Sequence, residues 1–420
     1  MILLLSGILS AAPLEAGQDP HQLWVRLAPE VSPVWLQKMG AVPSFSQRGP
    51  RLDRYYRFRA GDTARIEARL REDPRVDRLW FANLPIPPPD DIPPVTEDFR
   101  PLQTWLDASG GFSFVEGALW PGGRGEGVTV ADVEYAWHPE HEDLGATLGI
   151  QTWGVAYTDY FFHGNSVLGM LFGGVNGYGV DGAVPEATPM VLHPIDEDDS
   201  YDVAGAVAAA VTLLVPGDVL LVEQQGYAHG NYCPTSADPA VFDAIAAAVD
   251  AGIVVVEPGG NGGQDLDSER WQGAFDRSIA DSGSILVGGG AGPDSGMEPR
   301  SWYPYGSSHG SRLDVQGWYS GIVTATAGDY DGAYADLAWY NEDDRQAYTD
   351  SFGGTSGASP MVAAAAAVLQ SVTLAQGQPP WEPRELRAAL VASGTPQAAG
   401  DTALIGPQPD VRRLLRTWAR

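Results

Sequence analysis

The apolar and polar positions of residues 20–84 predict a small domain in which strands and helices alternate. Five segments follow in the order strand, helix, strand, helix, strand: residues 23–27, 33–39, 54–59, 63–71 and 76–81. A β-α-β-α-β unit of about 65 residues buries little surface. We therefore expect its stability to depend on docking to another surface.

A proline-rich stretch separates this unit from the rest of the chain. Residues 85–95 read Pro-Ile-Pro-Pro-Pro-Asp-Asp-Ile-Pro-Pro-Val. This composition does not form a helix or an interior strand, but it extends well as a spacer. We place a domain boundary here and assign residues 96–420 to one large domain.

Beyond the boundary, short apolar strands alternate with amphipathic or Ala-rich helices. The strands expected are residues 128–131, 190–192, 219–222, 253–256 and 285–287. A helix is expected at residues 239–251, ending before Gly252. Continuous apolar strands separated by helices predict a parallel sheet covered on both faces, and hence an α/β fold. In such sheets the chemistry gathers at the carboxyl ends of the strands.

The charge of the chain excludes some partners and is unevenly distributed. The chain has 25 Lys and Arg against 54 Asp and Glu, a formal net charge of −29, which disfavours nucleic acids and anionic membranes. Residues 1–95 hold 12 basic and 11 acidic residues, which leaves 13 and 43 for residues 96–420. A near-neutral, Arg-rich unit and an acidic one attract each other. Coding bias is the alternative explanation, because Lys38 is the only lysine.

Composition and the N-terminus narrow the class further. A hydrophobic content of 44% with 51 Gly and 33 Pro is typical of a globular protein rich in turns. Cys233 is the single cysteine, so no intrachain disulfide forms. Residues 1–16 resemble the apolar region and small-residue cleavage site of a signal peptide without its positively charged start. This predicts a secreted protein; a mis-assigned start or a buried N-terminus are the alternatives.

The stretch that carries most chemical information is residues 353–362, Gly-Gly-Thr-Ser-Gly-Ala-Ser-Pro-Met-Val, followed by five alanines. Ser356 lies where a Gly/Thr turn enters a helix, close to the helix's positive end, which favours developing negative charge. A serine hydroxyl needs a base, and the base needs an orienting carboxylate. Asp132 ends a predicted strand, and His163 opens a segment of small residues that predicts a helix lying close to the sheet.

An oxyanion formed in such a site needs fixed hydrogen-bond donors. Asn261 follows the predicted strand 253–256 directly, so its amide is a candidate donor. Each of these residues has a structural explanation on its own. The order Asp, His, Asn, Ser along one α/β chain is much harder to explain in that way.

With these residues in view, the sequence resembles the subtilisin-like serine proteases, or subtilases (peptidase S8), over nearly all of residues 120–420. The serine segment matches the family's Gly-Thr-Ser-x-[Ala/Ser]-x-Pro in full, and Asn261 matches the Asn of its Ala-Gly-Asn segment. The histidine segment differs only in Asn165, which replaces Thr. The acidic segment is looser: Asp132-Val133-Glu134 replaces Asp-Thr/Ser-Gly, and His-Glu-Asp-Leu at residues 141–144 replaces His-Pro-Asp-Leu after a slightly longer gap.

The resemblance implies a fold, an activity and a domain plan. The fold is a three-layer doubly wound α/β sandwich with a mostly parallel central sheet, and the catalytic residues are Asp132, His163 and Ser356, with Asn261 in the oxyanion hole. Residues 20–84 resemble the family's propeptide, a small α+β chaperone, with a permanently attached accessory domain as the alternative. The plan is therefore a signal peptide (1–16), a propeptide (20–84), a linker (85–95) and a catalytic domain (96–420).

The segments beside the expected site depart from the family pattern. Residues 222–226, Val-Glu-Gln-Gln-Gly, stand where the family has the substrate-pairing Ser-Leu-Gly-Gly, and Glu257 precedes the oxyanion Asn where alanine is common. The substrate-binding residues expected are Glu223, Gln224, Gln225, Gly226, Gly259 and Gly260. Two carboxylates near a Ser/His pair would attract a basic substrate residue or change the working pH. The alternative is that hydrogen bonds satisfy both and that they only shape the pocket.

The resemblance also bears on cofactors and partners. The chemistry requires no cofactor, and structural calcium is expected at Asp143 and the loop 174–180, with Asn176 as a ligand. The expected protein is a monomeric, secreted, self-processing serine endopeptidase whose partners are peptide or protein substrates and its own propeptide, with neither nucleic acid nor membrane. The alternatives are a processing protease dedicated to one partner and a catalytically silent binding protein.

Overall fold

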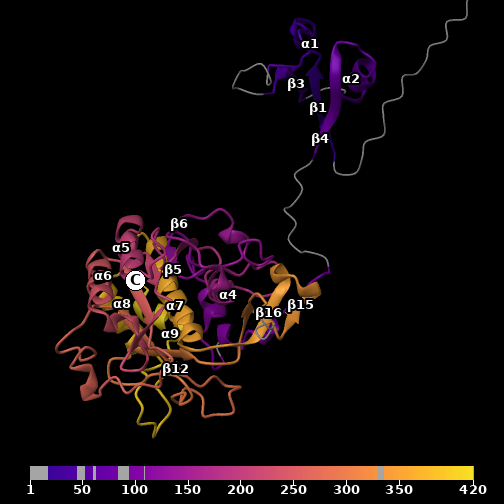
Figure 1. The fold of residues 1–420 in the computed structure, drawn as a ribbon. Coiled ribbons are helices and arrows are strands. Elements are labelled where there is room, and N and C mark those ends of the chain that lie inside the picture. Colours follow the sequence, from indigo (N-terminus) through magenta and orange to yellow (C-terminus); the bar gives the residue numbers. More distant parts are fainter. Residues whose placement is uncertain are drawn as a thin grey trace, which may run out of the picture. The chain divides into compact units, whose positions relative to one another are not determined.

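The computed structural model describes residues 18–44, 53–59, 63–83, 94–107, 109–328 and 335–419. The chain forms two compact units, Met1–Pro89 and Asp90–Arg420 (Figure 1). The predicted signal peptide and residues 85–93 of the proline-rich stretch lie outside the described residues.

The first unit is a small antiparallel sheet with two helices. Its elements are β1 (Gln18–Leu27), α1 (Val34–Lys38), β2 (Val42–Pro43), β3 (Tyr55–Phe58), α2 (Thr63–Leu70) and β4 (Val76–Asn83). The strand order is β2-β3-β1-β4, and Leu23, Val25, Leu36 and Phe58 are among its buried core residues. All five predicted segments are present, and the short edge strand β2 is added to them.

The second unit is built on a seven-stranded sheet of order β13-β12-β11-β8-β5-β7-β6. Every strand pair in it is parallel. The strands are β5 (Thr129–Val133), β6 (Thr152–Trp153), β7 (Thr188–Leu192), β8 (Val219–Leu221), β11 (Val254–Pro258), β12 (Ile285–Gly290) and β13 (Val315–Trp318). The five predicted strands form the centre of the sheet, and the two edge strands β6 and β13 were not predicted.

Helices cover both faces of this sheet, which explains its continuous apolar strands. Alternate residues of each strand serve opposite faces: Val130 and Val254 pack with α4 and α7, whereas Ala131 and Val255 pack with α5 and α6. The helices are α3 (Phe114–Gly117), α4 (Phe161–Phe172), α5 (Val203–Leu213), α6 (Pro239–Asp250), α7 (Thr355–Ala375), α8 (Pro383–Ser393) and α9 (Val411–Trp418). The result is the three-layer α/β arrangement that the sequence predicts.

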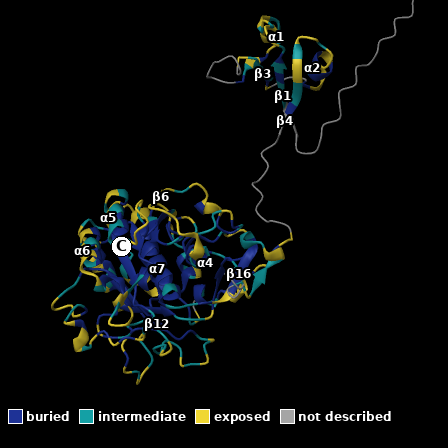
Figure 2. Ribbon diagram, viewed as in Figure 1, coloured by how far each residue is buried: buried dark blue, intermediate teal, exposed yellow. Residues whose placement is uncertain are grey.

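Helix α7 forms the centre of the core (Figure 2). Residues 363–367, five alanines, are fully buried, and because they lack bulk the helix lies directly against the sheet. By length and hydropathy alone α7 is the one helix of the described chain that passes as a membrane span, but 89% of that window is buried inside the protein. Its apolar character is therefore that of a core helix.

Two small antiparallel sheets complete the unit. One is a hairpin of β9 (Gln225–Ala228) and β10 (Asn231–Pro234), inserted directly after β8. The other has the order β14-β16-β15 and consists of β14 (Ile322–Ala325), β15 (Ala338–Trp339) and β16 (Ala347–Phe352). Neither sheet was predicted from the sequence.

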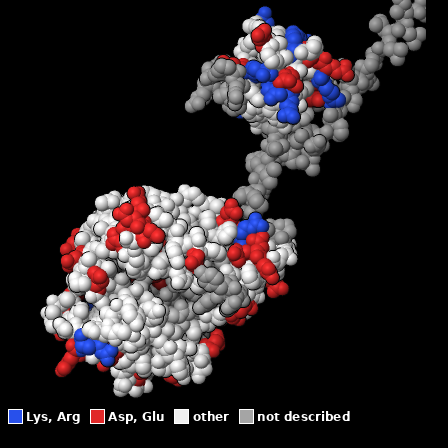
Figure 3. Space-filling model, in the orientation of Figure 1, with Lys and Arg blue, Asp and Glu red and all other residues white. Residues whose placement is uncertain are grey.

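The surface of the two units differs in charge (Figure 3). In this view Lys and Arg stand among Asp and Glu on the first unit, whereas the second unit shows mainly Asp and Glu. The uneven charge found in the sequence is therefore visible at the surface.

Candidate active site

Ser356 is the second residue of α7, which begins at Thr355. Gly354 precedes the helix with a φ of +79°, a conformation that a residue with a side chain rarely adopts. This turn directs the start of α7 to the carboxyl edge of the sheet. Ser356 is partly exposed there and lines a cleft of about 380 Å³, as the sequence predicts.

His163 approaches the same cleft from α4, where it is the third residue. The next residue, Gly164, allows this approach, because a Cβ added there would clash with the carbonyl oxygen of Ala136. Asn165 fixes the helix further: its Oδ1 accepts from the backbone N–H of His138 at 2.7 Å, and its Nδ2 donates to the Thr326 carbonyl at 2.7 Å. The residue that departs from the family's histidine motif therefore has a structural role.

The imidazole of His163 is held by Glu134. Its Nδ1 lies 2.6 Å from Oε2 of Glu134, and the other carboxylate oxygen, Oε1, accepts from the backbone N–H of Tyr135 at 2.8 Å. Burial lowers the pKa of His163, but the charge of Glu134, the hydrogen bond to it and the charge of Glu223 outweigh burial and raise that pKa to about 9. Glu134 thus occupies the place beside the imidazole that the sequence predicts for Asp132.

The assignment of Asp132 to the catalytic triad is wrong in this structure. Its side chain is fully buried, and neither carboxylate oxygen has a hydrogen-bond partner among the described residues. Burial raises the pKa of Asp132 well above its ordinary value, and the charges of Glu134 and Glu223 add to this effect. Asp132 is therefore a buried acid beneath the site, and its raised pKa favours the protonated form.

The geometry of β5 explains the error. Successive side chains of a strand point to opposite faces, so Asp132 and Glu134 share the face that α4 and α7 cover, and Glu134 lies two residues nearer the carboxyl edge. A signal for this was present in the sequence. The gap from Asp132 to Asp143 is longer than in the family, and counting from Glu134 shortens it by two residues, but the preference for Asp over Glu concealed this.

Asn261 lies just beyond β11, where the sequence places it. Its Oδ1 accepts from the backbone N–H of Thr355 at 2.8 Å and from the Thr355 hydroxyl at 3.1 Å. With Oδ1 occupied in this way, Nδ2 is the end of the amide that is left to donate, and Asn261 lines the cleft with Ser356. The geometry suits a donor for a developing oxyanion.

The cleft brings the predicted nucleophile, base and oxyanion donor together. Its lining residues are Tyr135, Tyr160, Phe162, His163, Glu223, Gln224, Gln225, Tyr232, Pro258, Asn261, Thr355 and Ser356. Among the residues that the structure describes, no hydrogen bond joins His163 Nε2 to Ser356 Oγ. In enzymes without substrate this contact is often long, so the lack of a hydrogen bond here is compatible with a base and nucleophile pair.

An aromatic wall that the sequence did not reveal stands beside this cleft. The Tyr135 ring lies 5.1 Å from that of Tyr160 and 6.1 Å from that of Tyr201, and Tyr160 lies 6.3 Å from Phe162. These residues come from separate parts of the chain, so no local pattern announces them. They give the cleft an apolar side.

Glu223 enters the site differently from the expectation. It is only 4% exposed, and its Oε1 lies 2.5 Å from the hydroxyl of Ser359 on α7. Burial raises the pKa of Glu223 to about 8, against the lowering influence of His163 and of hydrogen bonds from Ser359 and Ser356. The carboxyl is therefore directed at the serines of α7 and does not stand free to bind a basic substrate residue.

The other predicted substrate-binding residues divide into two groups. Gln224 and Gln225 line the cleft: Gln224 Oε1 accepts from the Tyr201 hydroxyl at 2.8 Å, and Gln225 Oε1 accepts from the backbone N–H of Asn261 at 3.0 Å. The glycines at 226, 259 and 260 are not among the residues that line it. Gly226 instead belongs to β9 and pairs with Cys233 of β10, Gly260 packs on Cys233, and Gly259 packs on β12.

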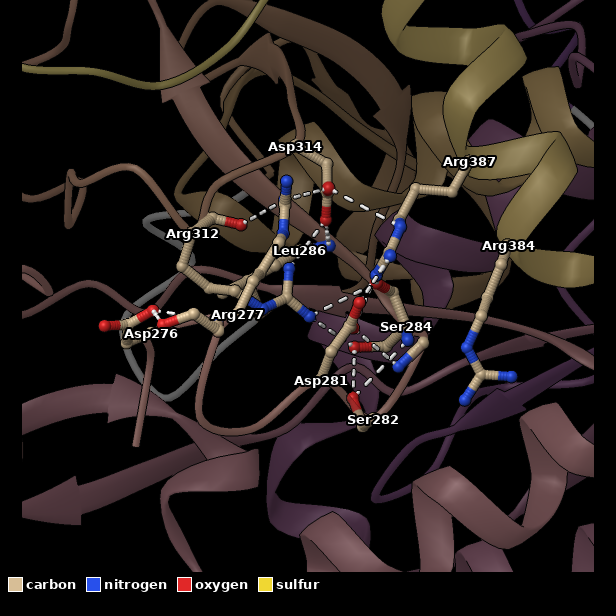
Figure 4. Close-up of polar contacts among 12 residues, drawn as sticks. Asp276, Arg277, Asp281, Ser282, Ser284, Leu286, Arg312, Asp314, Arg384 and Arg387 are labelled. Carbon is tan, nitrogen blue, oxygen red and sulfur yellow. Dashed lines mark hydrogen bonds and ion pairs between the residues drawn. The ribbon is translucent and has the colours of Figure 1, made fainter. Parts of the chain in front are cut away.

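Glu257 belongs to a separate buried ionic network. Its Oε1 accepts from the Ser284 hydroxyl at 2.6 Å, and Ser284 Oγ in turn accepts from Arg312 at 3.1 Å. Figure 4 shows the surrounding ion pairs, in which Arg312, Arg277 and Arg387 converge on Asp314 and Asp281. Glu257 therefore shapes the structure and does not face the cleft.

The predicted calcium residues do not fit a calcium ion. Asp143 Oδ1 accepts from Asn176 Nδ2 at 2.8 Å, and Oδ2 accepts from the backbone N–H of Val180 at 2.7 Å. A cation requires oxygen lone pairs that point inward, whereas hydrogen-bond donors occupy both carboxylate oxygens here. In the described residues no group of three or more His, Cys, Asp or Glu side chains is arranged to hold a metal.

Comparisons with known proteins agree with the geometry. Residues 125–406 match the family model described as the subtilase family, peptidase S8. The minor extracellular protease Epr of Bacillus subtilis (strain 168) is 27% identical over 175 residues, which are 40% of this chain and 26% of that protein. The chain thus spans about a quarter of the length of this curated relative.

Solved structures show the same fold at low sequence identity. A protease from Pseudoalteromonas arctica PAMC 21717 has a TM-score of 0.56 at 18% identity, covering 77% of this chain and 98% of that one. A lanthipeptide protease has a TM-score of 0.55 at 20% identity, covering 76% and 95%. These likenesses confirm the subtilisin-like α/β fold. Since the family model matches more than half of the chain, this protein belongs to the subtilase family of serine proteases.

Proposed function

We propose that this subtilase is a serine endopeptidase with a Ser356–His163–Glu134 triad. The observation that carries the proposal is the convergence of Ser356, His163 and Asn261 on one cleft, with Glu134 bonded to the far side of the imidazole. A silent binding protein would have no need of an imidazole aligned by a buried carboxylate. The relative Epr is named as an extracellular protease, which agrees with this activity.

The proposed mechanism is acyl transfer. Ser356 Oγ attacks the scissile carbonyl carbon while His163 Nε2 takes its proton, and Glu134 stabilises the resulting imidazolium through Nδ1–H. The oxyanion receives the Asn261 amide and the backbone N–H of Ser356. His163 then gives the proton to the leaving amine. Water next attacks the acyl-enzyme: His163 takes a proton from the water and returns it to Ser356 Oγ as the ester bond breaks.

We propose further that the protein is secreted as a proenzyme. Residues 1–16 act as the signal peptide, and the small unit with its Arg-rich composition acts as the propeptide of the acidic catalytic domain. The near-neutral, Arg-rich composition of the first part against the acidic composition of the second supports this pairing. The self-cleavage site falls between residues 81 and 94, in or next to the proline-rich stretch.

The hairpin of β9 and β10 beside the cleft suggests a narrow substrate specificity. We propose that the segments that follow β8 and β11 form the two sides of a crevice for the substrate and that β10 narrows it. Gly226 is the hairpin partner of Cys233 in β10, where an added Cβ would lie 3.3 Å from Cys233 Sγ, and a Cβ on Gly260 would lie 2.8 Å from Cys233 Cα. The hydrogen bond from Asn261 N–H to Gln225 Oε1 joins the two sides at 3.0 Å. We propose that little room remains for the substrate residue on the acyl side of the cleaved bond, P1. A restricted P1 site favours the alternative of a dedicated processing protease.

Replacing the nucleophile tests the activity and the self-processing together. Ser356→Ala is expected to abolish peptide cleavage, labelling by a fluorophosphonate probe and release of a new N-terminus between residues 81 and 94. N-terminal sequencing of secreted wild-type and variant protein measures the last of these. Cleavage that survives in a folded Ser356→Ala variant would refute the proposal.

A second experiment distinguishes the two buried acids at the end of β5, Asp132 within the strand and Glu134 directly after it. Glu134→Gln is expected to lower kcat by about 10³–10⁴-fold, because the imidazole loses the group that orients it and stabilises its charge. Asp132→Asn is the matched control and is expected to lower kcat by less than about tenfold, since Asp132 does not contact His163. The reverse ranking of the two variants would restore Asp132 as the triad acid.

The third experiment concerns the P1 residue. Peptides that differ only at P1 are expected to show higher kcat/KM with Gly or Ala than with Phe, Leu or Arg. In Gln225→Gly the ratio of Leu to Ala cleavage is expected to rise, because removing the bridge to Asn261 opens the crevice. Wild-type preference for a large P1 residue, or an unchanged ratio in the variant, would contradict a closed P1 site.

A further inference from the structure

We propose that Glu223 is a positioning residue for Ser356 that works in its protonated form, and that its ionisation ends activity at high pH. This inference rests on the proposed protease activity, and it adds a fourth acid–base group to the Ser356–His163–Glu134 triad. Nothing in the family signature assigns an acid to this position, where a serine is usual.

The position of Glu223 places it between the base and the nucleophile's helix. It follows β8 (Val219–Leu221), the strand between β5 and β11 in the sheet, and it lines the cleft together with His163 and Ser356. Its side chain is 4% exposed. A carboxyl group this deeply buried has little contact with water, so its protonation state depends on the neighbouring protein groups.

Counting protons around Ser359 shows which state the carboxyl has. Ser359 Oγ lies 2.5 Å from Glu223 Oε1 and 2.6 Å from the carbonyl oxygen of Thr355. A hydroxyl has one proton to donate, and an ionised carboxylate and a carbonyl both only accept. Two short contacts therefore require one more proton, which a protonated Glu223 supplies: its O–H donates to Ser359 Oγ, and the Ser359 O–H donates to Thr355.

This relay anchors the first turns of α7. It connects the end of β8 through Ser359 to Thr355, the residue directly before the nucleophile. The second oxygen, Glu223 Oε2, has no hydrogen-bond partner among the described residues. The Ser356 hydroxyl is nevertheless close enough to lower the pKa of this carboxyl group as a donor. A neutral carboxyl leaves the Ser356 proton available to His163, whereas a carboxylate would bind that proton and hold His163 as imidazolium.

The surrounding charges define the pH range. The groups that act on Glu223 are His163 of α4, Glu134 beyond β5, and Ser356 and Ser359 of α7, and Glu223 in turn acts on Asp132 of β5. Burial raises the pKa of Glu223 to about 8, while Glu134 and Glu223 hold that of His163 at about 9. Because the two groups interact, their protons leave in two steps that belong to the pair.

The active form has a neutral His163 and a protonated Glu223. Below both pKa values His163 is charged and does not accept the serine proton; above both, Glu223 is ionised. Activity is therefore expected to rise and then fall with pH, with its maximum between about 8 and 9. In that range the pair holds one proton, and the active arrangement is the less populated of its two forms, because the pKa of Glu223 lies below that of His163.

The test compares pH profiles of kcat/KM in the full-length protein after self-processing. Wild type is expected to give a bell. Glu223→Gln keeps a neutral group that donates to Ser359, so this variant is expected to retain activity and to lose the fall in activity at high pH. Its activity is expected to begin rising at lower pH, because the charge that raises the pKa of His163 is gone. Glu223→Ala breaks the link to Ser359 and is expected to lower kcat/KM by about tenfold or more at every pH. The Gln variant, which keeps the link, is expected not to show this loss.

Glu257→Gln is the matched control, because Glu257 is an equally buried acid on the neighbouring strand that faces away from the cleft. It is expected to keep the wild-type bell. A Glu223→Gln profile identical to that of wild type, or a Glu257→Gln profile that changes in the same way, would overturn the role of Glu223 while leaving the protease intact. A wild type that neither cleaves peptides nor reacts with a fluorophosphonate at any pH would overturn the proposed function, and this inference with it.

Discussion

One partly buried imidazole among three buried carboxyl groups is the constraint on which the site depends. His163 carries a single positive charge, and Asp132, Glu134 and Glu223 are each at most 4% exposed. An uncompensated charge in such surroundings is very costly. Glu134 contacts the imidazole directly and its charge raises the pKa of His163, whereas burial raises the pKa of Asp132 and of Glu223. Glu257, a further buried acid, differs from these three because Ser284 connects it to Arg312.

The fold brings these groups together through close approach of backbones. Parallel neighbours β5 and β8 bring Glu134 and Glu223 to one edge, and α4 and α7 add His163 and Ser356 from above. The alanine run of α7 lets this helix lie on the sheet, and Gly164 lets α4 lie on the chain leaving β5. The inserted hairpin follows β8 directly, so the proposed catalytic residues and the proposed P1 site are supported by the same strand ends.

Much of this arrangement could be predicted from the sequence, because the decisive signals are local. Continuous apolar runs predicted the parallel sheet, and the glycine turn before Ser356 predicted an exposed hydroxyl at a helix start. The choice between Asp132 and Glu134 could not be made by residue type, since both acids lie on the same face of β5 and only their depth separates them. The aromatic wall and the Ser359 relay join distant segments, so no pattern of neighbouring residues announces them, whereas the hairpin of residues 225–234 is local and was missed. The calcium expectation named Asp143 and the loop 174–180, and this loop does lie against Asp143, but Asn176 and Val180 meet the carboxylate as hydrogen-bond donors, which residue types alone do not reveal.

Titration of the His163 ring tests the account most directly. The imidazole signals of the seven histidines can be followed by NMR in isotopically labelled protein, with His163 identified by its loss in His163→Ala. The account predicts that His163 is protonated at pH 7 and titrates with a pKa of about 9. A His163 ring that is already neutral at pH 7 would show that the buried carboxyl groups do not hold its proton, and it would contradict the account.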